Sequence, residues 1–161
     1  GGKVMAEINT TKNLRLWLRT CPAISTIDRF NVDFMGRGPV EYALYSSPTT
    51  MDSGIDVLGN VFLRPIQELN YIFQALFHYS KDIPQNLNNL EFFTDVINWI
   101  YQQNVTKNFP QIEEGTVLSI MPTLSPYVYD ADSDSGRYQI QLKIRYRRKP
   151  DVERMKINAR K

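Results

Sequence analysis

The sequence contains one cysteine, Cys21, and one histidine, His78. A single cysteine excludes an internal disulfide and a multi-cysteine zinc site, and a single histidine leaves little for a histidine-based metal centre. We expect Cys21 to be a small buried residue just after a helix rather than a nucleophile. The sequence therefore predicts no metal and no cofactor.

Long apolar runs are also missing. No stretch approaches the ~20 residues of a membrane-spanning helix, and the N-terminus lacks a charged and then apolar signal peptide. We therefore expect a soluble protein made in the cytoplasm, with no membrane partner. Of the 161 residues, 42% are apolar and 12% aromatic, which favours a folded core over disorder. We expect one domain over residues 9–147, between a flexible N-terminus at 1–8 and a basic C-terminal extension at 148–161.

Catalytic signatures are absent as well. There is no glycine-rich phosphate loop, no Ser/His/Asp order and no pair of carboxylates on one element, so the sequence predicts no enzyme. One short match remains: His78 and Asp82 have the H-x-x-x-D spacing of CoA-dependent acyltransferases. Those enzymes follow the aspartate with glycine, whereas Ile83 stands here, so a small acyltransferase is the less favoured alternative.

Three aspartates, Asp130, Asp132 and Asp134, alternate like the first ligands of a calcium loop. Such a loop needs a glycine at its sixth position and a bidentate glutamate at its twelfth, which are Ser135 and Gln141 in this sequence. Aspartate, serine and glycine are also typical of a turn, because they bond to their own backbone or tolerate positive φ. We expect a connection that leads into a strand, and no calcium site.

Two helices are predicted from apolar residues at helical spacing. The first has its cap within residues 9–11 and ends at residues 21–22. The second follows Pro84, takes Asn88 or Asn89 as its cap and runs to about Gln103. Its apolar face contains Leu90, Phe93, Val96, Ile97 and Ile100.

Alternating apolar and polar residues predict the strands. Residues 27–35 and 40–44 are expected to form a hairpin around the turn at 36–39. Residues 69–80 are expected to form a central strand, and residues 116–121 and 138–146 two more. In the last strand we expect Gln139, Gln141, Lys143 and Arg145 to face outward. Without a βαβ rhythm, this order predicts an α+β fold: a mostly antiparallel β-sheet packed against two main helices.

Residues 46–65 are less regular and predict a projecting β-hairpin arm, with Gly59-Asn60 as a two-residue loop. The segment from Thr49 to Leu63 has more apolar surface than a lone hairpin can hide, so we expect a neighbouring subunit to cover it. The alternative is that the arm folds back on its own sheet. The candidate subunit-interface residues are Met51, Ile55, Val57, Leu58, Val61 and Phe62.

Positive charge gathers at the C-terminal end. Residues 143–161 have a net charge of +7, which leaves −5 for the rest of a chain whose total is +2. Such a segment is typical of a solvated tail, of an anchor to an acidic protein surface, or of non-specific contact with DNA. The lack of interleaved aromatic residues favours the first two. The candidate partner-contact or DNA-contact residues are Arg147, Arg148, Lys149, Arg154 and Lys156.

Five stretches, in this order and spacing, resemble one known family. They are WLRTCP (17–22), FNVDFMG (30–36), PVEYAL (39–44), FFTDVINWI (92–100) and YVYDADSDSGRYQIQLKIRY (127–146). Together they resemble the small minor capsid proteins of long-tailed phages, over most of residues 13–147. The last stretch is the most specific. Residues 46–65 depart from the family pattern, and the basic C-terminal extension lies beyond it.

The resemblance implies a tail terminator, in which α+β subunits form a sixfold ring on the finished tail tube. It implies a structural virion protein, made in the host cytoplasm, with no catalytic role. Its partners would be further copies of itself, the tail tube protein and the connector or neck proteins of the head. A head-completion or connector-adaptor protein is the alternative within the same structural class.

Overall fold

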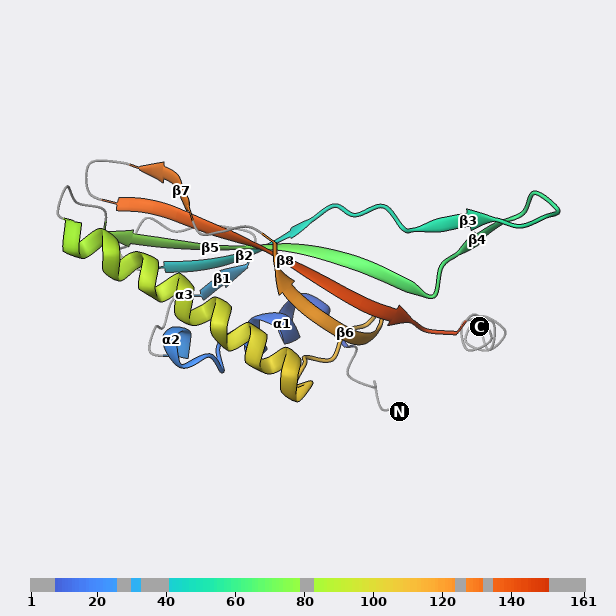
Figure 1. Cartoon of the computed structure of the whole chain (residues 1–161), viewed down its shortest axis with the longest axis horizontal. Coiled ribbons are helices and arrows are strands. Elements are labelled where there is room, and N and C mark those ends of the chain that lie inside the picture. The colour runs from blue at the N-terminus through green and yellow to red at the C-terminus, as the bar shows by residue number, and fades with distance from the viewer. Residues whose placement is uncertain are drawn as a thin grey trace, which may run out of the picture.

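The computed structural model describes residues 8–25, 30–32, 41–78, 83–123, 127–131 and 135–150. The helices in this part of the chain are α1 (Thr10–Leu18), α2 (Pro22–Ser25) and α3 (Ile83–Thr106). The strands are β1 (Phe30–Val32), β2 (Glu41–Ser47), β3 (Ser53–Ile55), β4 (Val61–Leu63), β5 (Ile66–His78), β6 (Gly115–Pro122), β7 (Tyr127–Ala131) and β8 (Ser135–Arg148). Figure 1 shows how these elements are arranged.

The main sheet has the strand order β1-β2-β5-β8-β6. Strand β7 also pairs with β8: it pairs with residues 136–139 of β8, whereas β6 pairs with residues 142–148. Its centre is the long antiparallel pair of β5 and β8, which runs in register from Ile66 opposite Arg147 to His78 opposite Ser135. Strands β3 and β4 form a separate two-stranded sheet that projects beyond the main sheet (Figure 1). The predicted α+β class, with its mostly antiparallel sheet and projecting hairpin, is confirmed.

The three helices lie on one side of the main sheet (Figure 1) and bury one core between them and the strands. Helix α1 begins as predicted, since the Asn9 side chain accepts a hydrogen bond from the Lys12 N–H at 2.9 Å. The indole of Trp17 donates to the Asn108 carbonyl at 2.8 Å and lies 4.7 Å from the Trp99 ring. The largest fully buried side chains include Tyr42, Phe73, Phe93, Leu14, Leu18, Ile140 and Tyr146.

The hairpin expected from residues 27–35 and 40–44 is wrong in its direction. Strands β1 and β2 pair in parallel, with Phe30 opposite Tyr42 and Val32 opposite Leu44. Alternation assigns side chains to the two faces of a strand, but the pattern is the same for either strand direction. The expected turn at 36–39 lies outside the described residues.

Helix α3 begins at Ile83, five residues before the earlier of the two expected caps, so Asn88 and Asn89 lie within the helix. The helix includes Pro84 in its first turn, where a missing N–H breaks no intrahelical hydrogen bond. It continues past the predicted end to Thr106 and stops where Lys107 takes a positive φ of 55°. The polar composition around residue 88 therefore does not mark the boundary.

Two details of the final hairpin also differ from the prediction. Asp130 lies in the unexpected strand β7, opposite Arg137 of β8, rather than in a connection; Asp132 and Asp134 lie outside the described residues. Gln139, expected to face outward, is buried, and its Oε1 accepts a hydrogen bond from Gln74 Nε2 at 2.9 Å. Two amides that form a hydrogen bond with each other can be buried at little cost. Alternation along a strand therefore does not by itself predict which side chains are exposed to solvent.

Candidate functional site

The arm, residues 49–63, ends in a hairpin whose two short strands are joined by a five-residue loop. Strands β3 and β4 pair from Ser53 opposite Leu63 to Ile55 opposite Val61, which leaves residues 56–60 as the loop. The predicted two-residue loop at Gly59-Asn60 is therefore wrong. Gly59 takes the positive φ of 85° that the loop requires.

The loop is held by one carboxylate. The side chain of Asp56 accepts hydrogen bonds from the N–H groups of Leu58 and Asn60, both at 2.9 Å. These bonds, with the Asn60 N–H as the largest contribution, hold the pKa of Asp56 below its ordinary value. An aspartate followed by glycine and asparagine is a recognisable turn signal, and it could have identified this loop from the sequence.

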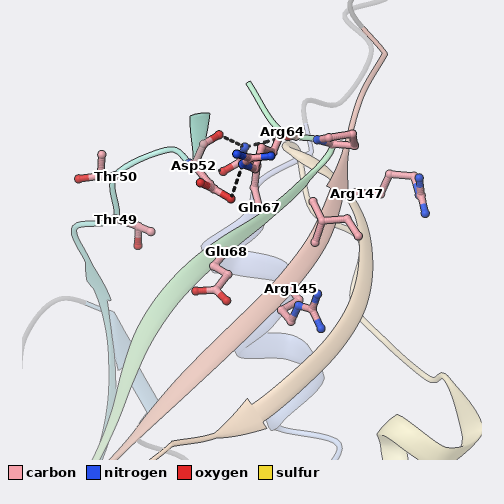
Figure 2. Close-up of a pocket in the computed structure, with 10 residues that line it drawn as sticks. Thr49, Thr50, Asp52, Arg64, Gln67, Glu68, Arg145 and Arg147 are labelled. Carbon is pink, nitrogen blue, oxygen red and sulfur yellow. Dashed lines mark hydrogen bonds and ion pairs between the residues drawn. The ribbon is translucent and has the colours of Figure 1, made fainter. Parts of the chain in front are cut away.

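The root of the arm is fixed to the main sheet by a buried amide. Gln67, on β5, is 1% exposed. Its Oε1 accepts from the Asp52 N–H at 2.7 Å, and its Nε2 donates to the carbonyls of Asp52 and Arg64 at 2.7 and 2.8 Å. Figure 2 shows Gln67 below Asp52 and Arg64 at the start and end of the hairpin. No pattern in the sequence singles out Gln67, because it lies within an ordinary strand.

The six candidate interface residues fall into two groups in the single chain. Met51 and Phe62 are partly covered: the Tyr146 hydroxyl lies 3.8 Å from the Met51 sulfur, and Arg64 lies 5.8 Å above the Phe62 ring. The other four are bare, with exposed fractions of 72% for Ile55, 101% for Val57, 83% for Leu58 and 71% for Val61. The hairpin points away from the main sheet (Figure 1), so the arm does not fold back on its own sheet.

A hollow of about 530 Å³ lies where the arm leaves the sheet. Its charged lining residues are Asp52, Glu68, Arg64, Arg145 and Arg147, which Figure 2 shows around the start of β5 and the end of β8. Arg64 pairs with Asp52 at 3.5 Å, and Lys143 pairs with Glu68 at 3.8 Å. Both carboxylates therefore have a cation nearby, so the arginines Arg145 and Arg147 give the hollow an excess of positive charge.

The basic candidates lie partly within this region. Arg147 is exposed, whereas Arg148 and Lys149 are half-buried. The Arg148 N–H donates to the Pro65 carbonyl at 2.9 Å and the Lys149 N–H to the Glu114 carbonyl at 3.4 Å, so the backbone of the expected extension begins as part of the fold. Arg154 and Lys156 lie outside the described residues.

The remaining candidates from the sequence are Cys21, the acyltransferase-like pattern at His78 and a possible metal site. Cys21 is buried, and burial raises the pKa of its thiol. His78 is the last residue of β5, while Lys81 and Asp82 of the acyltransferase-like pattern lie outside the described residues. In the part of the chain that the structure describes, no three His, Cys, Asp or Glu residues are grouped as a metal site would need.

Comparison with known proteins adds no assignment: no protein-family model matches the chain, and no curated protein matches it. Within the described ranges, no helix is long and apolar enough to cross a membrane.

Proposed function

We propose that this chain is a structural, non-catalytic ring subunit of the tail-terminator type found in long-tailed phages. Six copies form a ring that caps the tail tube and meets the head connector. The proposal joins the family resemblance of the sequence to one structural observation: an arm that is fixed at its root and leaves four of its apolar side chains exposed to solvent.

The arm has enough apolar surface to contribute substantially to association. Burying a Val, Leu or Ile side chain is worth ~1.5–3 kcal/mol, so covering Ile55, Val57, Leu58 and Val61 is worth ~6–12 kcal/mol. Association itself costs ~4–15 kcal/mol in lost freedom and ordering. The arm therefore offsets much of that cost, and contacts between the bodies of neighbouring subunits supply the rest.

A projecting arm suits a ring built from one repeated contact. If the arm meets a different surface on its neighbour and the neighbour does not return the contact, the contact is heterologous. Heterologous contacts close into rings when the rotation between subunits divides a full turn. A hairpin anchored by Gln67 keeps one direction relative to the sheet, so the same rotation can repeat between neighbouring subunits, as a closed ring requires.

The positive hollow at the arm root supports docking to an acidic surface of the tube or connector. Arg145 and Arg147 line it on consecutive outward positions of β8. Non-specific contact with DNA in the channel is the alternative occupant. Removing residues 152–161 should leave the fold and the hollow intact, because the hollow is built from residues before 150. It should weaken only docking to a neighbour, because it removes the positive charge of the C-terminal extension.

Point variants of the arm test the proposal. At a dilution at which both chains are monomeric, the double variant Val57→Gln/Leu58→Gln should unfold with a free energy within ~0.5 kcal/mol of the native chain, because both side chains are exposed in the single chain. It should lose rings in light scattering and fail to cap purified tail tubes. Leu16→Gln, which replaces an exposed leucine on α1, is the matched control and should form rings normally. Normal assembly of the arm variant would show that the arm is not the interface.

A further inference from the structure

A second hollow, of about 430 Å³, is lined by residues that do not belong to the arm. We call it the side pocket. Its apolar lining includes Ile8, Phe109, Pro110 and Val117, and the charged residues that line it are Lys107 and Lys149. Its volume falls within the ~300–1,000 Å³ typical of ligand pockets. An apolar lining with two lysines suits a partner that has an apolar group beside a negative charge.

One wall of the side pocket is the loop after α3, which helix α1 holds in place. After α3, the carbonyls of Asn108 and Gln111 accept hydrogen bonds from Trp17 Nε1 at 2.8 Å and Asn13 Nδ2 at 2.9 Å. The Glu113 N–H donates to the Thr10 hydroxyl at 2.9 Å. A pocket whose wall is fixed in this way exists before any partner arrives, so little ordering cost opposes its filling.

Among the described residues, the negative side chains nearest to this wall, Glu113 and Glu114, do not line the pocket. The Glu114 carboxylate accepts hydrogen bonds from the Thr10 hydroxyl at 2.7 and 3.1 Å. Glu113 and Glu114 line a neighbouring hollow beside Thr10 and Tyr71, which shares Ile8 with the side pocket. The side pocket therefore keeps the positive character of Lys107 and Lys149.

The tip of the arm has the complementary chemistry. Val57 and Leu58 are the most exposed pair of apolar neighbours on the arm, and they directly follow the carboxylate of Asp56. Hydrogen bonds from the loop backbone keep that carboxylate ionised and fixed. The arm cannot use its own side pocket, because the hairpin points away from the body (Figure 1) and Gln67 fixes its root.

We propose that the tip of the arm, Asp56–Leu58, enters the side pocket of a second copy of this chain. Val57 and Leu58 contact its apolar lining, and Asp56 lies between Lys107 and Lys149. The inference rests on the proposed ring, and it identifies the acceptor surface that the ring requires. Each copy presents a tip to one neighbour and a pocket to the other, as a closed heterologous ring demands.

Cysteine cross-linking of the full chain tests this contact. Leu58→Cys places a thiol at the tip, and Gln111→Cys places one on the rim of the pocket. Cys21 is 1% exposed and does not compete for the reagent. With a short bismaleimide, this double variant should give a ladder of covalent multimers at least ~10-fold faster than the control Leu58→Cys/Glu91→Cys, whose second thiol is exposed on α3 outside the pocket.

The outcomes separate this inference from the proposed function. Rings of normal mass that cross-link no faster than the control would overturn the docking site and leave the ring proposal intact. Absence of any ring in the native chain would overturn both.

A charge cycle tests the same contact without cysteines. Asp56→Asn keeps an oxygen that can accept the loop hydrogen bonds and removes the negative charge. In the native background it should weaken association ~10-fold, because a close interfacial charge pair is lost. In a Lys107→Glu/Lys149→Glu background it should strengthen association, because Asp56 would then face like charges. A change by the same factor in both backgrounds would overturn the proposed contact.

Discussion

Replacing Gln67 by leucine removes the three side-chain hydrogen bonds that join the root of the arm to β5. Leucine has a similar size, so the change tests the amide rather than a cavity. A net hydrogen bond is worth ~0.5–1.5 kcal/mol, and a buried group left unpaired costs ~1–3 kcal/mol. The Asp52 carbonyl keeps one partner, the Arg64 N–H at 3.0 Å, which limits the loss. We expect a loss of ~2–3 kcal/mol of unfolding free energy.

Two assays measure the effect of Gln67→Leu. Thermal unfolding should show a midpoint lower by ~5–10 °C, at ~2–4 °C per kcal/mol for a domain of this size. Amide hydrogen exchange should show the Arg64 N–H losing at least ~10-fold protection, because its partner carbonyl at Asp52 is released from β5. Gln102→Leu, an exposed glutamine on α3, is the matched control and should change stability by less than ~0.5 kcal/mol. An unchanged midpoint with unchanged Arg64 protection would refute the anchoring role of Gln67.

Three further predictions follow from other contacts. Asn104→Ala should cost ~2–3 kcal/mol in denaturant unfolding, because its side chain bonds to both the N–H and the carbonyl of Ile120 and so joins α3 to β6; a loss below ~0.5 kcal/mol would contradict this. The stabilisation of the arm loop by Asp56 should be present above the ordinary aspartate pKa of ~3.9 and be lost as the pH falls through the lowered pKa of the folded state; a carboxyl titration by NMR with a midpoint at or above ~3.9 would refute it. Gly54→Ala should displace the Phe62 ring, because an added Cβ would lie 2.6 Å from it, and unchanged ring chemical shifts would argue against that packing.

The centre of the fold could be predicted from the sequence because its signals are long. Strands β5 and β8 alternate over many residues, and the apolar sides of both strands face the helices. When only one face of a strand is buried, its pairing register is strongly specified, because a shift by one residue would move all of its apolar side chains to the solvent-facing side. The start of the first helix was predictable for a different reason, because Asn9 is a strong cap. The expected end at residues 21–22 was wrong, because α1 ends at Leu18 and Pro22 begins the short helix α2.

Other features depend on contacts between distant residues, which local patterns do not encode. The parallel pairing of β1 with β2 is a matter of chain direction, which alternation does not determine. The burial of Gln139 requires Gln74, 65 positions away, and the anchoring by Gln67 requires the backbone at Asp52. These polar residues look like solvent-facing positions in the sequence, because only the fold supplies their partners.

The arm shows both cases within one segment. Its existence and its apolar excess could be predicted, because the residues around Gly59 read as a hairpin between two apolar runs. The loop was longer than expected, because Asp56 bonds to the backbone of Leu58 and Asn60 and so moves the turn toward the N-terminal side. The side pocket, the surface proposed to receive the arm, was not predicted, because it gathers residues from the N-terminal segment, the loop after α3, the start of β6 and the end of β8.

The mass of the native chain in solution tests the ring most directly. Mass photometry or light scattering at micromolar concentration should give a dominant species near six times the 18.7 kDa of one chain. The same measurement on a chain in which a short Gly/Ser linker replaces residues 53–62 should give a folded monomer. A native chain that is monomeric at micromolar concentration and forms no ring on assembled tails would contradict the account.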